Sequence, residues 1–143
     1  MQLALSHRER FTIALRIPSW AGSNSKATVN GSGVDAQLEP GTWLNIDRDW
    51  KDGDHIELSL GMPLHLAQID DQHPSTVALL YGPLALFAIQ PGAHTITEKQ
   101  LLAAQRIGNS SAWEITTDSG RIRMLPYSEI KDETYRLYHQ TRT

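Results

Sequence analysis

Hydrophobic and polar residues alternate in several short runs along the first half of the chain. In the run FTIALRI, every second residue from Phe11 to Ile17 is large and apolar, and the residues between them are polar or small. A period of two is typical of a β-strand with one buried face. Pro18 lacks the N–H that a central strand needs, so we expect this strand to end there.

The same alternation recurs in two later runs, 42–48 and 56–60. In the first run, one predicted face carries Leu44, Ile46 and Arg48, and the other carries Trp43, Asn45 and Asp47. Turn sequences separate the runs: Asn30-Gly31, Pro40-Gly41 and Asp52-Gly53. Asn-Gly is a strong hairpin signal because both residues tolerate positive φ.

The middle of the chain has a different pattern. Residues 76–80 and 84–89 are nearly all apolar, which predicts strands covered on both faces. One short helix is expected near residues 96–106, because Thr95 and Glu98 fit a capping box and Gly108 is a suitable stop.

Many short strands separated by turn signals predict an all-β fold, an antiparallel β-sandwich or jelly roll with the one short helix. With 143 residues the chain is long enough for a hydrophobic core. We therefore predict a single β-sandwich domain over 1–143.

Composition excludes several classes of function. The net charge is −3 and lysine and arginine do not cluster, so we expect no nucleic-acid partner. The chain has no cysteine, which excludes disulfides, thiolate metal sites and a cysteine nucleophile. No apolar run is long enough for a signal peptide or a membrane span. We expect a soluble chain without a membrane partner, and the sequence predicts no particular compartment.

Candidate catalytic and metal-binding groups are weak. The acidic cluster is Asp47, Asp49, Asp52 and Asp54. An EF-hand loop needs ligands at positions one, three and five and a glycine at position six. Counted from Asp47, position five is Lys51 and Gly53 falls at position seven, so the sequence does not match. A polar hairpin turn is the favoured interpretation, and a weak calcium site is the alternative. The six histidines show no ligand spacing, and the adjacent acidic pairs lie in hydrophilic loops. We predict no catalytic, cofactor-binding or metal-binding residue.

The four tryptophans offer a different possibility. Trp43 lies on the predicted polar face beside Asn45, an aromatic ring flanked by hydrogen-bonding groups, and Trp20 follows the Pro18 stop. Trp43, Asn45 and Trp20 are therefore candidate glycan contacts, with packing in a core or domain interface as the favoured alternative. Trp50 and Trp113 are expected to point inward.

A combination of short motifs resembles a known family. These are LRIPSW, Asn30-Gly31, Pro40-Gly41, Arg48-x-Trp50-x-x-Gly53-Asp54, LLYGPL at 79–84 and the tail LPYSEIKDETYRLYH. Their order and spacing resemble the C-terminal β-sandwich region of glycoside hydrolase family 127, the β-L-arabinofuranosidases, once a domain of unknown function. The resemblance extends from Leu3 to His139.

This resemblance implies a parent enzyme whose catalytic α/α-barrel precedes the sandwich. The family's proposed mechanism uses a cysteine nucleophile near zinc with glutamate assistance, and none of these residues can be carried over to this chain. Zinc would belong to the missing barrel. The leading hypothesis is a non-catalytic accessory module that braces the barrel or mediates subunit contacts. The alternative is a carbohydrate-binding module acting through exposed tryptophan.

The resemblance also places further strand sequence before Gln2–Leu5, a predicted strand that starts almost at Met1. We therefore expect a truncated reading frame or a designed fragment of a larger barrel-plus-sandwich hydrolase. An unpaired sheet edge near the N-terminus would follow. Such an edge could pair with a second copy of the chain and give a homo-oligomer.

Overall fold

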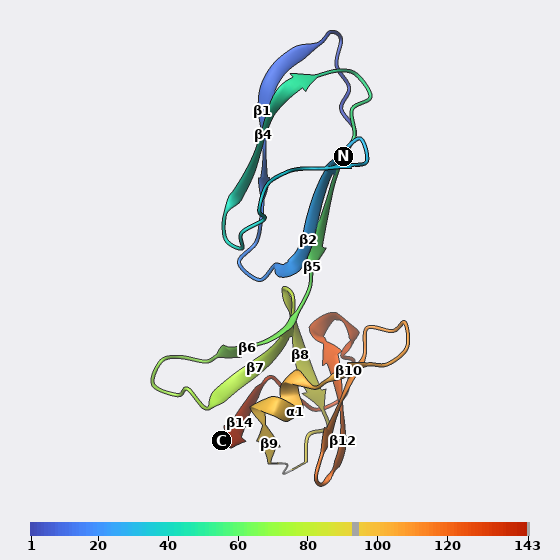
Figure 1. Ribbon diagram of the computed structural model, residues 1–143. Helices are drawn as coiled ribbons and strands as arrows, with labels where there is room; N and C mark the ends of the chain where they lie inside the picture. Colours follow the sequence, from blue (N-terminus) through green and yellow to red (C-terminus); the bar gives the residue numbers. More distant parts are fainter. Residues whose placement is uncertain (93–94, 143) are drawn as a thin grey trace. The chain divides into compact units, whose positions relative to one another are not determined.

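The structure is a computed structural model that describes residues 1–92 and 95–142 (Figure 1). The chain divides into two compact units, Met1–Pro63 and Leu64–Thr143. Each unit has its own cluster of buried side chains. The sequence predicts one domain over 1–143, and the structure instead shows two cores.

The first unit is a small antiparallel sandwich. Its strands are β1 (Glu9–Arg16), β2 (Gly22–Val29), β3 (Ser32–Gly33), β4 (Trp43–Trp50) and β5 (Ile56–Gly61). One sheet pairs β1 with β4, and the other has the order β3-β2-β5. Its core takes side chains from both sheets, including Ile46 and Trp50 from the first and Val29 and Ile56 from the second. The two sheets therefore bury their inner faces against each other.

The predicted alternation is present in β4. Leu44, Ile46 and Trp50 are buried, whereas Trp43 and Asn45 are exposed. Trp50 is fully buried, as predicted, and its indole Nε1 donates a 2.9 Å hydrogen bond to the backbone oxygen of Phe11 on the paired strand. A buried indole N–H needs such a partner, so this bond lets the large ring lie in the core.

The N-terminal segment forms less regular structure than the predicted strand. Gln2 makes an isolated antiparallel bridge with His55. Backbone bonds also join Met1 to Ile56 and Leu3 to Asp54. The segment therefore lies along the start of β5, which is the edge strand of its sheet.

The second unit is built on one larger sheet. Its strands are β6 (Leu64–Gln68), β7 (Thr76–Tyr81), β8 (Leu84–Ile89), β9 (Ile96–Thr97), β10 (Gln105–Arg106), β11 (Trp113–Thr117), β12 (Gly120–Pro126), β13 (Tyr135–Arg136) and β14 (Tyr138–Arg142). The main order is β10-β11-β12-β8-β7-β14-β9, with β6 paired to β7 and β13 to β8. All pairings are antiparallel except that of β14 with β9.

The apolar middle of the chain forms the centre of this sheet. Val77 and Leu79 of β7 and Leu86 of β8 are almost completely buried in the core, and Ala78 on the other face of β7 is buried as well. The prediction of a strand covered on both faces is therefore confirmed for the middle of β7, Val77–Leu79. It does not hold for Leu84, whose side chain is 45% exposed.

The helix is shorter than predicted. It is α1 (Glu98–Leu102), capped by Thr97, whose hydroxyl accepts from the N–H of Gln100 while the Gln100 side chain accepts from the N–H of Thr97. The predicted Thr95–Glu98 box is thus wrong by two residues, because Ile96 and Thr97 are held in β9 by pairing with β14. The helix ends early because Gln105 and Arg106 pair with β11.

The all-β prediction is confirmed. Apart from α1, the described residues contain one short 3₁₀ turn, η1 (Tyr127–Glu129), and otherwise strands and connecting loops.

The β2–β3 turn generates the first testable prediction. Asn30 and Gly31 have φ values of 52° and 80°, as a two-residue hairpin turn requires. Gly31→Ala should destabilise the first unit by about 1–2 kcal/mol, because a Cβ is disfavoured at positive φ. Urea unfolding followed by tryptophan fluorescence measures this loss.

Gly33→Ala is the matched control. Gly33 lies two residues further on, and a Cβ there would also meet open space, but its φ is not in the left-handed region. Its substitution should change stability by less than about 0.5 kcal/mol. Equal losses in the two variants would contradict this account of the turn.

Candidate functional site

Trp43 and Asn45 lie on the exposed face of β4, as their spacing predicts. The Trp43 side chain is 56% exposed. Arg16 is its cross-strand partner on β1, and the Arg16 guanidinium carbon lies 5.6 Å from the centre of the Trp43 ring. This cation–π contact orients the ring. It also occupies part of the ring surface that a sugar could use.

Trp20, the third candidate glycan contact, is placed differently. It follows β1, is half-buried and packs against the core of the first unit. The structure therefore brings Trp43 and Asn45 together on one strand face but gives Trp20 mainly a packing role. Trp113 is buried in the core of the second unit, as predicted.

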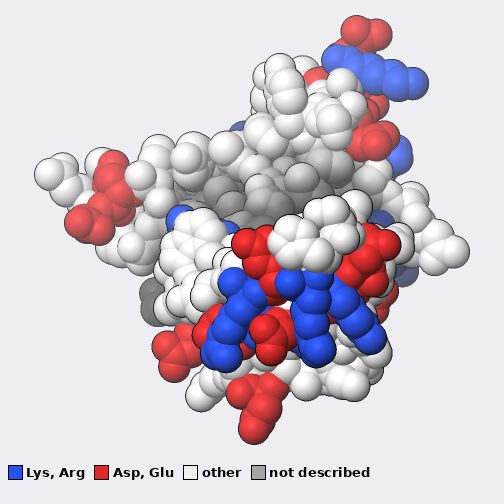
Figure 2. Space-filling model, turned by 90° about the horizontal axis from the view of Figure 1, so that it is seen from above, with Lys and Arg blue, Asp and Glu red and all other residues white. Residues whose placement is uncertain are grey.

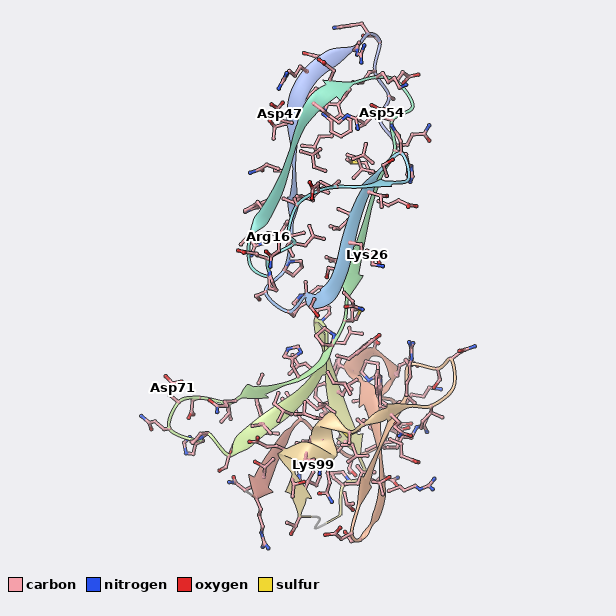
Figure 3. The ribbon with its side chains drawn as sticks, in the orientation of Figure 1. Arg16, Lys26, Asp47, Asp54, Asp71 and Lys99 are labelled. Atoms are coloured by element: carbon pink, nitrogen blue, oxygen red, sulfur yellow. The ribbon has the colours of Figure 1, made fainter. Side chains whose placement is uncertain are left out.

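The acidic turn between β4 and β5 forms a structural network. Asp54, which is labelled in Figure 3, is only 1% exposed. Its carboxylate accepts hydrogen bonds from Asn30 Nδ2 at 2.9 Å and from the N–H of Lys51 at 3.0 Å. The Asn30 side-chain oxygen in turn accepts from the N–H of His55. These donors, with the Asn30 bond contributing most, hold the pKa of Asp54 below its usual range.

The other carboxylates of this cluster face solvent. Asp52 accepts from the N–H of Leu5, and Asp47 pairs with Arg10 at 2.9 Å on the exposed surface of the β1–β4 sheet. Within the described residues, no group of three or more histidine, aspartate or glutamate side chains is arranged to hold a metal ion. The space-filling view shows basic and acidic side chains interleaved on one face (Figure 2).

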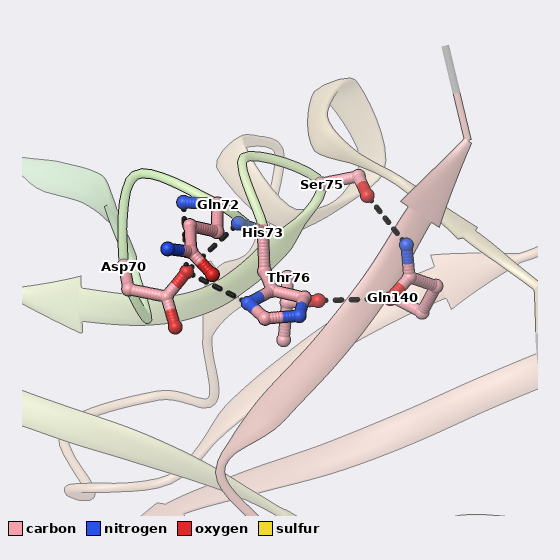
Figure 4. Close-up of polar contacts among 6 residues, drawn as sticks. All are labelled: Asp70, Gln72, His73, Ser75, Thr76 and Gln140. Atoms are coloured by element: carbon pink, nitrogen blue, oxygen red, sulfur yellow. Dashed lines mark hydrogen bonds and ion pairs between the residues drawn. The ribbon is translucent and has the colours of Figure 1, made fainter.

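A second polar cluster lies at the β6–β7 turn of the second unit (Figure 4). The Asp70 carboxylate accepts from the N–H groups of Gln72 and His73 and lies 2.7 Å from His73 Nδ1. Ser75 and Thr76 instead bond to Gln140 on β14. The aspartate and histidine resemble part of a hydrolytic triad. However, both side chains are about half exposed, and the Ser75 hydroxyl is bonded to Gln140.

A cavity of about 500 Å³ adjoins this turn and is lined in part by Ser75, Thr97, Lys99 and Arg142. Its polar groups serve the local structure. The Ser75 backbone oxygen accepts from both the N–H and the hydroxyl of Thr141, and Thr97 caps α1. Of the described residues that line this cavity, Ser75, Thr97 and Thr141 are therefore used in capping and strand pairing.

His139 is the buried histidine of β14. It is 3% exposed, and its Nε2 has no hydrogen-bond partner. Burial, with a smaller contribution from the Arg136 charge, lowers its pKa to about 4. The ring is therefore neutral at pH 7 and acts as a core side chain. His94 lies outside the described residues.

The sequence analysis missed one aromatic cluster. Phe87 of β8, Tyr127 of η1 and Tyr135 of β13 lie in mutual ring contact, with centroids 5.5–6.3 Å apart. Tyr127 and Tyr135 are 66% and 50% exposed. Tyr127 and Tyr135 are far from Phe87 in sequence, so the sequence pattern did not reveal the cluster. The alternation in the 84–89 run shows only that Phe87 points to the other face of the strand from Leu86 and Ala88.

Comparison with known proteins finds a family match within the first unit. Residues 1–62 match the family model for the middle domain of GH127 β-L-arabinofuranosidases. The match ends one residue before the boundary of the first compact unit at Pro63. It agrees with the family named by the sequence resemblance, although the matching model describes a middle domain. Among curated proteins, none matches this chain.

Solved GH127 structures resemble the whole fold. A GH127 β-L-arabinofuranosidase from Geobacillus stearothermophilus T6 aligns over 99% of this chain at 18% identity, with a TM-score of 0.72. A GH127 β-arabinofuranosidase aligns over 94% of this chain at 18% identity, with a TM-score of 0.68. A structure described as a glycoside hydrolase aligns over 94% of this chain at 20% identity, with a TM-score of 0.65. The aligned region is 28% of each of those proteins.

The described residues contain no helix with the length and apolar character needed to span a membrane.

Asp54 supports a prediction about stability. Asp54→Ala should lower the melting temperature of the first unit at pH 7, because the side-chain N–H of Asn30 and the backbone N–H of Lys51 lose their partly buried acceptor. Asp49→Ala, at an exposed position of the same acidic cluster, should leave it nearly unchanged. The Asp54 contribution is present at neutral pH and is lost as the pH falls through the lowered pKa. A D54A variant as stable as D49A would argue against the network.

His139 predicts the pH dependence of the second unit. The unfolded chain binds a proton at His139 below about pH 6.5, whereas the folded chain binds it only near pH 4. Stability should therefore fall as the pH drops from about 6.5 to 4, by up to about 3 kcal/mol. His139→Leu should remove this slope while folding at pH 7, since it replaces an unpaired polar atom. Urea unfolding at several pH values provides the measurement, and an undiminished slope in H139L would refute the assignment.

Proposed function

We propose that this chain is a non-catalytic accessory module of a GH127-type glycoside hydrolase and that it braces the catalytic α/α-barrel of that enzyme. Its place is in the β-sandwich region that follows the barrel. The observation that carries the proposal is the agreement between the family match over 1–62 and the compact unit Met1–Pro63. The alignment of nearly the whole chain with about a quarter of each GH127 structure supports it.

The internal structure of the first unit suits a bracing role. Its stability comes from a shared core and from the Asp54 network, both of which are satisfied within the unit. A module that folds on its own contacts can present a fixed surface to a neighbouring domain. Subunit contacts are a related role. The N-terminal segment pairs with Ile56 at the start of the edge strand β5, and the part of β5 beyond Ile56 offers its edge to a second copy.

One observation favours a second candidate function, that of a carbohydrate-binding module. The Trp43 ring is 56% exposed beside Asn45 and is oriented by Arg16. A fixed and exposed indole can stack on the C–H face of a sugar.

The bracing proposal predicts that the barrel carries the hydrolytic activity and that this chain only stabilises the barrel. The purified chain should not hydrolyse an aryl β-L-arabinofuranoside. The barrel encoded upstream should melt at a lower temperature when expressed without these 143 residues than with them, because it loses the contacts that the module supplies. Thermal melting and the hydrolysis assay on the three proteins measure both effects.

Two outcomes would contradict this proposal. One is unrelated coding sequence upstream of the chain. The other is hydrolysis by the isolated chain that is abolished by a single carboxylate substitution.

A further inference from the structure

The second unit has an aromatic surface on the face of its sheet opposite the core. Leu86 and Ala88 of β8 belong to the core cluster, so the residues between and beside them point to the other face. The register places Phe87 opposite Leu125 of β12, and Ile89 opposite Tyr135 of β13. Three strands therefore contribute apolar side chains to this outer face.

Two tyrosines on this face are exposed and held in place. The Tyr135 ring meets Phe87 edge-on, at 5.5 Å and 86°, and it meets Tyr127 at 6.3 Å and 87°. Edge-to-face contacts of this kind are favourable. Phe87 is half-buried and anchors both tyrosines. The exposed rings are thus oriented before any ligand arrives, which limits the entropy lost on binding.

A polar cavity adjoins the aromatic cluster. It has a volume of about 330 Å³ and is lined by Arg123, Leu125, Glu129, Lys131, Glu133 and Ser110, among others. Leu125 connects the two features because it lines the cavity and lies opposite Phe87. Tyr127 and Glu129 belong to the same short turn, η1.

The charges of this cavity are balanced. Arg123 and Lys131 offset Glu129 and Glu133, so the lining supplies both donors and acceptors. One Glu133 oxygen already accepts from the N–H of Lys131 at 2.8 Å, which fixes its side chain. A balanced set of donors and acceptors suits a ligand that carries many hydroxyl groups and no net charge. It does not suit a nucleic acid, which requires excess positive charge.

We propose that the exposed tyrosines Tyr127 and Tyr135, together with the adjoining cavity at Glu129 and Glu133, bind a neutral oligosaccharide. The rings contact the apolar C–H surface of one sugar residue. The carboxylates and Arg123 bond to the hydroxyls of the next. This site goes beyond the bracing function and is distinct from the Trp43 surface of the first unit.

Saturation-transfer difference NMR with arabinotriose and xylotriose as probes tests the proposal. The wild-type chain should transfer saturation to at least one of these sugars. Tyr127→Ala and Tyr135→Ala should each weaken binding about tenfold, the loss expected for one aromatic contact. Glu129→Gln, which keeps the shape of the side chain, should weaken binding as well. Ile69→Ala, at an exposed apolar position of the β6–β7 turn, is the control and should bind like the wild type. Trp43→Ala tests the other candidate surface.

The outcomes separate this site from the others. Binding lost in W43A but kept in Y127A and Y135A would overturn the proposal and favour the Trp43 surface. Failure to transfer saturation to either sugar would also overturn it. So would a result in which Y127A abolishes self-association of the chain but leaves sugar binding unchanged. That last result would identify a protein-docking surface. None of these results bears on the upstream coding sequence or on barrel stability, which test the bracing function separately.

Discussion

The first unit depends on one buried carboxylate. Asp54 joins the β4–β5 turn to the β2–β3 turn through Asn30, and its backbone oxygen accepts from Leu3 of the N-terminal segment. Three segments distant in sequence are thus held at one end of the sandwich. A buried charge is tolerated only when hydrogen bonds replace its hydration, and here Asn30 and Lys51 supply them. The acidic turn therefore stabilises the fold.

The second unit is organised by a different constraint, the apolar β7–β8 pair. Its inner face is covered by the core, to which α1 contributes Leu101. Its outer face is covered only in part, by the rings of Tyr127 and Tyr135 on Phe87. A sheet centre that is apolar on both sides needs cover on both sides. The exposed aromatic surface is thus a direct consequence of the composition of the 76–89 segment.

Local patterns allowed much of the first unit to be predicted. The faces of β4, the burial of Trp50 and the Asn30-Gly31 turn follow from alternation and turn chemistry within a few residues. Features set by distant pairing could not be read this way. Arg16 covers Trp43 only because the β1–β4 register makes them partners. The start of α1 shifted because β14 holds Thr97. The division at Pro63 was hidden because strands β5 and β6 flank it with only two residues between them.

The distribution of features between the two units bears on function. The family match lies wholly in the first unit, whose core and Asp54 network are formed by its own residues. The oriented tyrosines and the charge-balanced cavity lie in the second unit. Trp43 is as exposed as these tyrosines, but Arg16 lies over its ring. Beside the tyrosine cluster, Leu125 both lines a cavity and lies opposite Phe87. A sugar needs both a ring to stack on and groups to bond its hydroxyls. The tyrosine cluster with its adjoining cavity offers both, which is why the proposed glycan site is placed there and not at Trp43.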